Sequence, residues 1–452
     1  MSRRVVGLLA LVLLSGACSR WCGAVGPGLA AKQAEMRRLA PADSGTDPVT
    51  EGRIRDLLLS VEPDQLSAFK FDLEYDGDDK DMVEYVFHDV DRTGVQRAIV
   101  DHLKKAPPHD GVKVLSDVDD TIYGNLIDRR YPRSPNKTPY PGVLAFYDAL
   151  KYEPHRSDTG RFVHDGIAQV PITTLSARPN PIVGRLEKRS IASLIDLTRP
   201  ASRGPLALQL RPSALSGHAT SSTLGTLETV FRNRLAVGLS FVGAPPQTSL
   251  NPGEQPVDLL TDKVPHGQED QIAEVKFMNF LSFASVYPEY RFVFVGDSGQ
   301  ADALTAQRIV ESGAVKGGPR VITTFIHDLK DRSNQTRPPS PAFDRLPATL
   351  RVGRASASGR GVIVFRNYVD AAVIAYTHRA TLGDLITAHE LVAVTLAALR
   401  EIDAADIDDV TLRESLRREY RDDANVAADL VKPSGAAVDP AAEIRRMLAT
   451  RF

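Results

Sequence analysis

Short apolar runs alternate with helical patterns from about residue 111 onwards, and this alternation constrains the fold more than any other feature of the chain. Strand-like runs are predicted at 112–115, 170–175, 291–295, 320–326 and 362–365. Helical patterns are predicted at 139–152, 272–286 and, roughly, 366–430. Strands that alternate with helices form a parallel sheet covered on both faces. The sequence therefore predicts an α/β fold with a doubly wound, mostly parallel, Rossmann-like sheet.

The region before this alternation is predicted to be helical. Apolar residues such as Ile54, Leu57 and Leu58 recur at helical spacing within 49–105, which indicates a small helical accessory region. Residues 24–48 are rich in Gly, Ala, Pro and polar residues, which favours a linker. The acidic run 76–81 lacks the ligand spacing and the closing Glu of a calcium loop, so we interpret it as a solvated turn.

Two stretches interrupt the strand and helix pattern. Residues 200–268 are rich in Ser, Gly, Pro and Thr with weak periodicity, and we expect a large insertion there. Residues 330–360 read as a linker or an exposed loop. The main domain is therefore predicted at 108–376, followed by a C-terminal helical region and tail at 377–452.

Composition excludes some classes of protein. The 452 residues suggest two or three domains, and 42% hydrophobic residues are enough for an ordinary core. Lys and Arg number 55 against 57 Asp and Glu, a formal net charge of −2. This balance gives no reason to expect nucleic acid as a partner.

The N-terminus resembles a secretory signal peptide over residues 1–24. Arg3 and Arg4 precede the apolar run from Val5 to Leu14, and small residues follow it. The run is too short to span a bilayer comfortably. We expect an exported protein that is secreted, periplasmic or lipid-anchored at the membrane surface. The alternative is a buried helix or an uncleaved anchor.

Both cysteines, Cys18 and Cys22, lie in this segment. The residues before Cys18 approach a bacterial lipobox, although Ser15 stands where an aliphatic residue is usual, so lipid attachment at Cys18 stays open. No cysteine follows Cys22. The rest of the chain therefore has no disulfide framework, no thiolate zinc site and no cysteine nucleophile.

Acidic residues gather where the 112–115 run ends. Asp117, Asp119 and Asp120 follow that run, and Thr121 comes next. Catalytic and ligand-binding groups in open parallel sheets lie at the carboxyl ends of the strands. Acids bunched at such a place are costly unless a cation or substrate compensates them. The alternative is a cluster that caps the next helix.

Polar residues also follow other predicted strands. Ser176 and Arg178 come after 170–175, and Asp297 and Asp302 come after 291–295. Lys276 lies near the start of the helix that leads into this last strand. We prefer Lys276 to Lys263 as the functional lysine, because one predicted helix and one predicted strand lead from Lys276 to Asp297. The histidines, such as His266 and His327, lack metal-ligand spacing, so we expect no zinc site.

In chain order this set resembles the motifs of the haloacid-dehalogenase superfamily of phosphotransferases. The run Asp117-Val118-Asp119-Asp120-Thr121 matches the first motif, Asp-x-Asp-x-Thr. Ser176 matches the hydroxyl of the second motif, Lys276 the lysine of the third, and Asp297 with Asp302 the acids of the fourth.

A narrower likeness covers roughly 111–376. The chain is similar to the catalytic domain of the actin-patch-associated phosphatidate phosphatases, which are related to lipins. The segments that carry this likeness are Ser116 to Ile122, Tyr140 to Gly142, Leu175 to Pro179, Val295 to Gln300 and Phe365 to Tyr368.

The resemblance implies the roles of the catalytic residues. Asp117 would attack phosphorus and form an aspartyl-phosphate. Asp119 would protonate the leaving alkoxide and then deprotonate the hydrolytic water. Ser176 and Lys276 would bind phosphoryl oxygens. Thr121 would fix the motif loop through its hydroxyl, while Asp120 is left as structural or electrostatic.

The resemblance also implies Mg²⁺ as the cofactor. Asp297 and Asp117 would hold it together with the backbone of Val118 or Asp119, and Asp119 and Asp302 complete the predicted metal site. Asp302 would bind the metal directly or through a water. Arg178 would contact the phosphate or head group, or only cap a helix.

The reaction implied is the hydrolysis of phosphatidate to diacylglycerol and phosphate. Two alternatives stay open: a phosphatase of a soluble phosphate ester, and a non-catalytic phosphatidate-binding module, against which the presence of Asp117 and Asp119 argues. A lipid substrate would require peripheral membrane contact. The insertion offers Leu206, Leu208 and Leu210 near Arg203 and Arg211 for this, or is a disordered loop.

Overall fold

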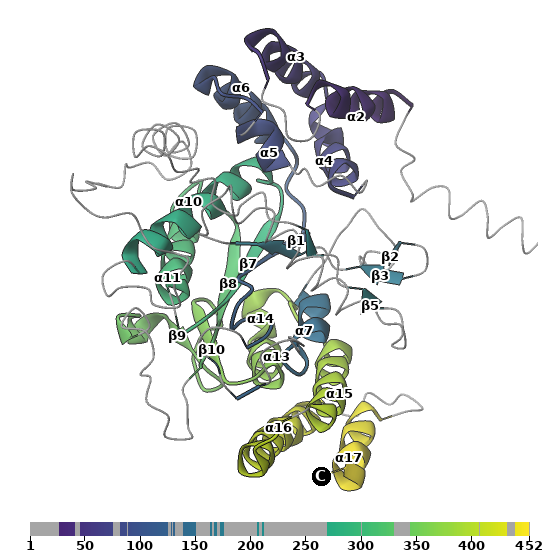
Figure 1. Cartoon of the computed structure of the whole chain (residues 1–452), viewed down its shortest axis with the longest axis vertical. Helices are drawn as coiled ribbons and strands as arrows, with labels where there is room; N and C mark the ends of the chain where they lie inside the picture. The colour runs from purple at the N-terminus through teal and green to yellow at the C-terminus, as the bar shows by residue number, and fades with distance from the viewer. Residues whose placement is uncertain are drawn as a thin grey trace, which may run out of the picture.

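Figure 1 shows the computed structural model of the chain. The structure describes residues 27–40, 46–75, 82–87, 89–124, 128, 130–131, 139–150, 163–164, 167–169, 172–175, 206–207, 210–211, 269–299, 301–329, 344–405, 407–431 and 439–451. The predicted signal peptide with Cys18, the acidic run 76–81, Ser176, Arg178 and nearly all of the predicted insertion lie outside these residues. Among the described helices, none is both long and apolar enough to cross a membrane.

The centre of the fold is a parallel sheet of seven strands in the order β6-β4-β1-β7-β8-β10-β9. Every neighbouring pair in it runs parallel. The strands are β1 (Val112–Ser116), β4 (Ile172–Thr174), β6 (Leu210–Arg211), β7 (Arg291–Asp297), β8 (Val321–His327), β9 (Arg351–Val352) and β10 (Val362–Phe365). The predicted α/β class with a parallel sheet is confirmed.

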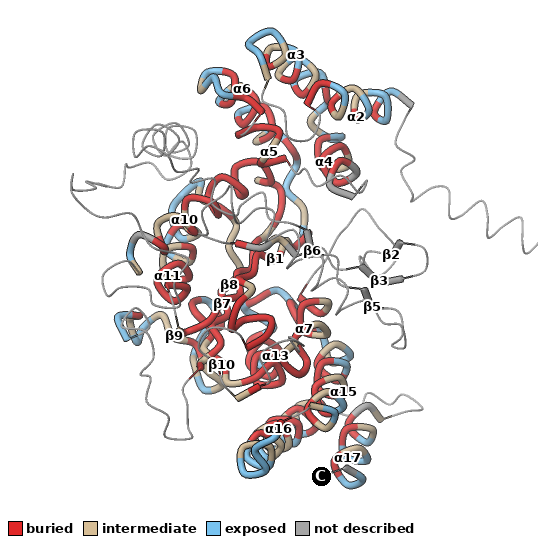
Figure 2. Tube along the Cα trace, viewed as in Figure 1, coloured by how far each residue is buried: buried red, intermediate tan, exposed pale blue. Residues whose placement is uncertain are grey.

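Both faces of this sheet are covered by helices, as the buried residues of Figure 2 show. Val114 and Val293 point into a core shared with α7 (Val143–Leu150) and α13 (Tyr368–Thr377). Leu115 and Phe294 point into a core shared with α10 (Glu269–Val286) and α11 (Asp302–Ala314). A strand buried on both faces has to be apolar at consecutive positions, which explains why the strand runs are legible in the sequence.

The C-terminal helices extend the first of these two cores. They are α14 (Arg379–Leu382), α15 (Ala388–Ala404), α16 (Val410–Leu430) and α17 (Pro440–Arg451). α15 packs against α7 and α13, and α16 packs against α13 and α15. The capping box of Thr387 and Glu390 starts α15. The division of the chain near residue 376 stays a prediction, but the helices beyond it bury apolar residues in the same cluster as the sheet.

The predicted helical region before the sheet is present. It contains α3 (Pro48–Leu59), η1 (Pro63–Gln65), α4 (Leu66–Tyr75), α5 (Met82–Phe87) and α6 (Thr93–Leu103). The predicted linker at 24–48 is wrong in its middle, because α2 spans Pro27–Leu39 and buries Leu29, Met36 and Leu39. Pro27 is favoured at a first helical position, and the alanines and other good helix formers that follow it outweigh Gly28.

The predicted linker at 330–360 also contains regular structure. η2 (Ala348–Leu350) leads into β9, which pairs with β10 at the edge of the sheet. A strand of two residues is too short to leave a periodic pattern in the sequence. A separate small sheet joins β2 (Val163–His164), β3 (Ile167–Gln169) and β5 (Leu206–Ala207).

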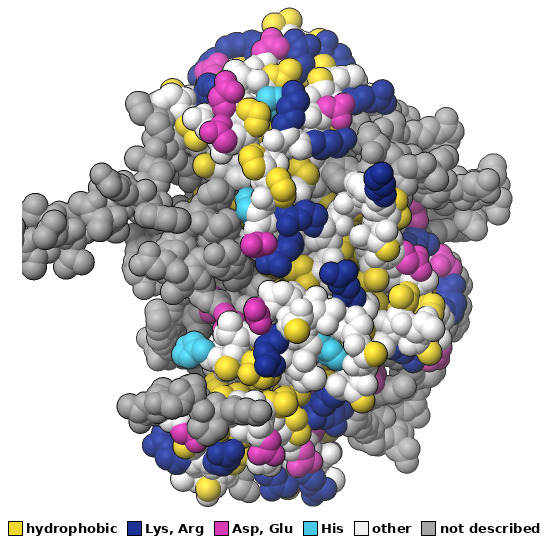
Figure 3. Space-filling view, turned by 180° about the vertical axis from the view of Figure 1, so that it is seen from behind, with side chains coloured by type: hydrophobic (Ala, Val, Ile, Leu, Met, Phe, Trp, Pro, Cys, Tyr) yellow, Lys and Arg dark blue, Asp and Glu magenta, His cyan; other side chains and the backbone are white. Residues whose placement is uncertain are grey.

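Exposed charges are mixed on the surface. On the face drawn in Figure 3, Lys and Arg side chains are spread among acidic and apolar ones over the described part of the molecule. This distribution agrees with the even balance of acids and bases in the sequence. Neither the net charge nor the face drawn in Figure 3 indicates a surface dominated by one sign of charge.

A buried ion pair joins the N-terminal helices to α10. Lys70 of α4 is 0% exposed and Glu289 is 1% exposed. The Lys70 ammonium lies 2.7 Å from Glu289 Oε2 and donates to the Val286 carbonyl, 2.9 Å away, at the end of α10. Ser67 donates a further hydrogen bond of 3.0 Å to Glu289 Oε1. A cation is favourable at a helix C-terminus, so this pair fixes one end of α10.

We expect Lys70→Met to destabilise the fold by about 3–5 kcal/mol, because Glu289 would be left buried and unpaired. The double variant Lys70→Met/Glu289→Leu should recover most of that loss. Urea unfolding measures both effects. Arg345→Met is the matched control, since Arg345 and Asp270 form a pair of 3.0 Å with half-exposed side chains, and such a pair contributes less than about 1 kcal/mol. Equal losses in the single and double variants would contradict the role assigned to the pair.

Candidate active site

The predicted catalytic acids lie at the carboxyl ends of two neighbouring strands. Within the sheet, β4 and β6 lie next to β1 toward one edge, whereas β7, β8 and β10 lie toward the other edge. The chain order thus reverses between β1 and β7, and crevices at such switch points bind ligands in open α/β sheets. Asp117 follows β1 directly, and its N–H donates to the Val295 carbonyl of β7 at 2.9 Å. Asp297 is the last residue of β7.

Lys276 of α10 links two of these acids. Its ammonium donates to Asp117 Oδ1 at 2.9 Å and to Asp302 Oδ1 at 2.5 Å. Asp302 is the first residue of α11 and accepts a hydrogen bond of 3.3 Å from the Asp297 N–H through Oδ2. The structure therefore brings together four predicted site residues: Asp117, Lys276, Asp297 and Asp302.

Burial of these groups changes their pKa values. Burial alone would lower the pKa of Lys276, but the carboxylates of Asp117 and Asp302 outweigh it and hold the pKa above its usual range. Burial raises the pKa of Asp302 to about 6, although the Lys276 ammonium opposes the shift. Burial and the nearby carboxylates of Asp302 and Asp117 raise the pKa of Asp297 well above its ordinary value. Lys276 thus stays charged while the acids repel one another.

The same acids could hold a metal ion. Asp117, Asp297 and Asp302 each offer one carboxylate oxygen, and these oxygens lie within 4.8 Å of one another. Asp297 Oδ1 accepts from the Gly299 N–H at 2.6 Å, but its buried Oδ2 has no hydrogen-bond partner among the described residues. One ammonium cannot balance three carboxylates. Hard carboxylate oxygens with excess negative charge fit Mg²⁺.

Asp119 is not part of this group of oxygens, although we predicted it among the metal ligands. It is 4% exposed and lies in the loop after β1. That loop turns sharply at Asp120, which has a φ of 58°. The Ile122 N–H donates to the Val118 carbonyl at 2.9 Å, and the Asp120 N–H donates to the Tyr123 carbonyl at 2.8 Å. The turn thus follows Asp119 directly.

The loop is held at Thr121 through the backbone. Its hydroxyl is buried and has no hydrogen-bond partner among the described residues. Its backbone carbonyl instead accepts a hydrogen bond of 2.5 Å from the Tyr368 hydroxyl. The predicted role of the Thr121 hydroxyl stays a prediction, and the anchor present among the described residues acts on the Thr121 backbone.

Sequence reasoning gave two neighbours of this loop, His327 and Tyr368, no role in it, although the segment Phe365 to Tyr368 carries part of the family likeness. The ring of His327, the last residue of β8, lies with Nδ1 3.3 Å from the Asp120 carbonyl and Nε2 3.1 Å from the Arg366 carbonyl. Burial, with a contribution from Arg130, lowers the pKa of His327 to about 4. The available signal was positional: His327 ends a strand, and Tyr368 follows one closely.

Ser176 and Arg178 lie outside the described residues, so their place in the site stays a prediction. No protein-family model, curated protein or solved structure matches the chain. A function can therefore be inferred only from the geometry of the site and from the resemblance of its motifs.

Gly296 has to be small for this geometry to exist. A Cβ there would lie 2.6 Å from Asp302 Oδ2 and 2.7 Å from its Cβ. We expect Gly296→Ala to push Asp302 away from Lys276 and to cost about 1–3 kcal/mol of stability, as overpacking does. Chemical denaturation would measure this loss. Gly353→Ala is the control, because a Cβ at Gly353 meets nothing within 4 Å. Equal stability of both variants would contradict the close approach of Asp302.

Proposed function

We propose that this protein is a Mg²⁺-dependent phosphatase that hydrolyses phosphate monoesters through an aspartyl-phosphate on Asp117. The observation that carries the proposal is the buried contact of Lys276 with Asp117 and Asp302, beside Asp297, at the switch point of the sheet. The resemblance of the motifs to the haloacid-dehalogenase superfamily supports it. A doubly wound Rossmann-like sheet, which that resemblance implies, agrees with helices on both faces.

The first half-reaction transfers the phosphoryl group. A carboxylate oxygen of Asp117 attacks phosphorus, the ester P–O bond breaks, and the leaving alkoxide takes a proton from Asp119. The Lys276 ammonium, 2.9 Å from Asp117 Oδ1, offsets the negative charge on the phosphoryl oxygens. Ser176 is proposed to donate a further hydrogen bond to the same oxygens.

The second half-reaction restores the enzyme. Asp119, now a carboxylate, takes a proton from water, whose oxygen attacks phosphorus as the bond to Asp117 breaks. Inorganic phosphate leaves, and Asp119 is again protonated. When bound, Mg²⁺ offsets the charge of the phosphoryl group and of the acids that hold it, Asp117, Asp297 and Asp302.

The proposed substrate is phosphatidate, and this choice rests on the narrower resemblance alone. A soluble phosphate ester is the alternative. The leucines suggested for membrane contact fall in the insertion, where only Leu206, Ala207, Leu210 and Arg211 are described. Phosphate release from phosphatidate vesicles, measured beside a panel of soluble phosphomonoesters, separates the two.

Asp117→Asn should lower phosphate release by at least about a thousandfold, because a carboxamide cannot form the acyl phosphate. Circular dichroism and the thermal unfolding temperature should show that the variant is folded. Asp344→Asn is a control for the substitution itself, since Asp344 is exposed and is not one of the residues assigned to the site. Activity of Asp117→Asn within a few-fold of the unchanged protein would refute the mechanism.

Asp297→Asn should weaken the response to Mg²⁺. A specifically bound ligand raises the unfolding temperature, so added Mg²⁺ should stabilise the unchanged protein and rescue its activity after chelation. The variant should lose both effects. Without metal it should be at least as stable as the unchanged protein, because a buried like charge is removed. Calorimetry with and without Mg²⁺ measures this, and undiminished Mg²⁺ stabilisation of the variant would exclude Asp297 as a ligand.

A further inference from the structure

The backbone that directly follows Asp119 is held from two sides by residues distant in sequence. The Thr121 carbonyl accepts from the Tyr368 hydroxyl at 2.5 Å. The Asp120 carbonyl lies 3.3 Å from Nδ1 of His327, whose Nε2 is 3.1 Å from the Arg366 carbonyl. The short segment 366–368, after β10, thus holds the Thr121 carbonyl through Tyr368 and lies beside His327, whose neutral ring donates to only one of its two carbonyl neighbours.

Tyr368 is well suited to fix the loop. It is 0% exposed, and its ring packs against Phe365 at 5.1 Å and against Phe146 at 5.4 Å between centroids. Burial raises the pKa of Tyr368 well above its ordinary value, so the hydroxyl keeps its proton and remains a donor. A rigid ring with a permanent donor holds the Thr121 carbonyl in one place.

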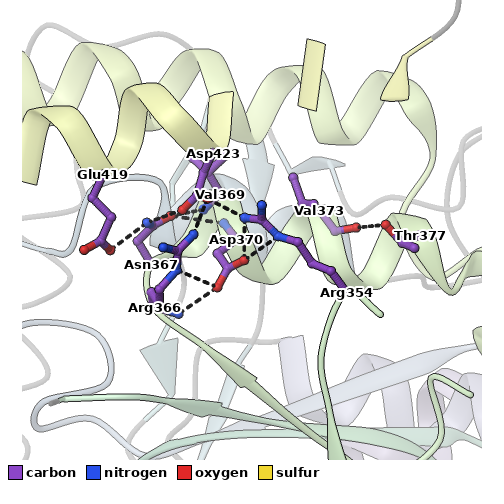
Figure 4. Close-up of polar contacts among 9 residues, drawn as sticks. All are labelled: Arg354, Arg366, Asn367, Val369, Asp370, Val373, Thr377, Glu419 and Asp423. Atoms are coloured by element: carbon purple, nitrogen blue, oxygen red, sulfur yellow. Dashed lines mark hydrogen bonds and ion pairs between the residues drawn. The ribbon is translucent and has the colours of Figure 1, made fainter. Parts of the chain in front are cut away.

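The segment 366–368 is itself held by α16. Asn367 caps α13, because its Oδ1 accepts from the N–H groups of Val369 and Asp370. Its Nδ2 donates to Oδ2 of Asp423 on α16 at 2.7 Å. Figure 4 shows Asp423 and Glu419 reaching from α16 toward Asn367, with Arg354 and Arg366 near Asp423.

Asp423 is the centre of this contact. It is 1% exposed and forms ion pairs with Arg354 and Arg366, which also pair with Asp370. A buried carboxylate with several charged partners holds their relative positions, since its charge is costly to bury without them. The C-terminal helices therefore set where Tyr368 stands.

We propose that Tyr368, placed by Asn367 and Asp423, is a positioning residue for the general acid Asp119. The proposal rests on the proposed function. Asp120 adopts a left-handed backbone, which aspartate tolerates better than most non-glycine residues, and the surrounding contacts help to hold it there. The hydrogen bond from Tyr368 to the carbonyl of Thr121, the residue after Asp120, helps to hold this conformation. Loss of it should let Asp119 move relative to the leaving group.

Leaving groups of different basicity test this directly. A short-chain phosphatidate releases an alkoxide that requires a proton from Asp119, whereas p-nitrophenyl phosphate releases a stable phenolate that hardly does. General acid catalysis contributes roughly 10²–10⁴-fold. Tyr368→Phe should therefore lower kcat/KM by about tenfold or more for the alkyl ester, but by less than about threefold for the aryl ester. Asp119→Asn should show the same preference for the aryl ester, with a larger loss of kcat/KM for the alkyl ester.

Tyr376→Phe is the matched control. Tyr376 lies on the same helix, and its ring packs against Arg379 at 4.4 Å, a contact that a phenylalanine ring retains. Both esters should then react as with the unchanged protein. Asp423→Asn should reproduce the selective loss of Tyr368→Phe, because it loosens Asn367.

Hydrogen exchange gives a readout that does not require activity. The amides of residues 120–123 should exchange faster in Tyr368→Phe, and not in Tyr376→Phe. Equal loss on both esters, or unchanged exchange, would overturn the positioning role. If the unchanged protein hydrolyses neither ester, the proposed function fails instead, and the two failures are thus distinct.

Discussion

The position of one ammonium group, that of Lys276, makes the arrangement of this site feasible. It lies between Asp117 and Asp302, both buried, and without it the carboxylates at the edge of the sheet would repel one another in a medium of low polarity. The lysine depends in turn on α10, whose C-terminal end is fixed by Lys70 and Glu289. The N-terminal helices thus contribute to the site although they supply none of its proposed catalytic residues.

The sheet explains why residues far apart in sequence meet. Because β1 and β7 are parallel neighbours, Asp117 and Asp297 emerge at the same edge. β8 and β10 continue that edge, so His327 and the segment 366–368 reach the loop after β1. α16 then acts on the same segment through Asp423. Support for the site is therefore spread over both ends of the described chain, whereas the proposed chemistry lies at its centre.

Local sequence signals made part of the fold and of the site predictable. The strands β1, β7, β8 and β10 were legible because burial on both faces requires consecutive apolar residues, and Asp117, Lys276, Asp297 and Asp302 stood at strand and helix ends. What the sequence did not reveal depends on distant contacts. No local pattern links Tyr368 to Thr121 or Asp423 to Asn367, and β9 is too short for periodicity. α2 was missed because Gly and Pro indicate a linker, whereas the alanines of the same segment are the best helix formers.

Direct detection of a phosphoryl group on Asp117 is the measurement that tests the central claim most closely. Asp119→Asn keeps the nucleophile but cannot activate water, so the second half-reaction should be slower than the first with an aryl phosphate. Acid quenching within milliseconds, followed by mass spectrometry of the peptides, should then find a phosphoryl adduct on Asp117 and none in Asp117→Asn/Asp119→Asn. An adduct on another residue, or turnover without any adduct at Asp117, would contradict the account.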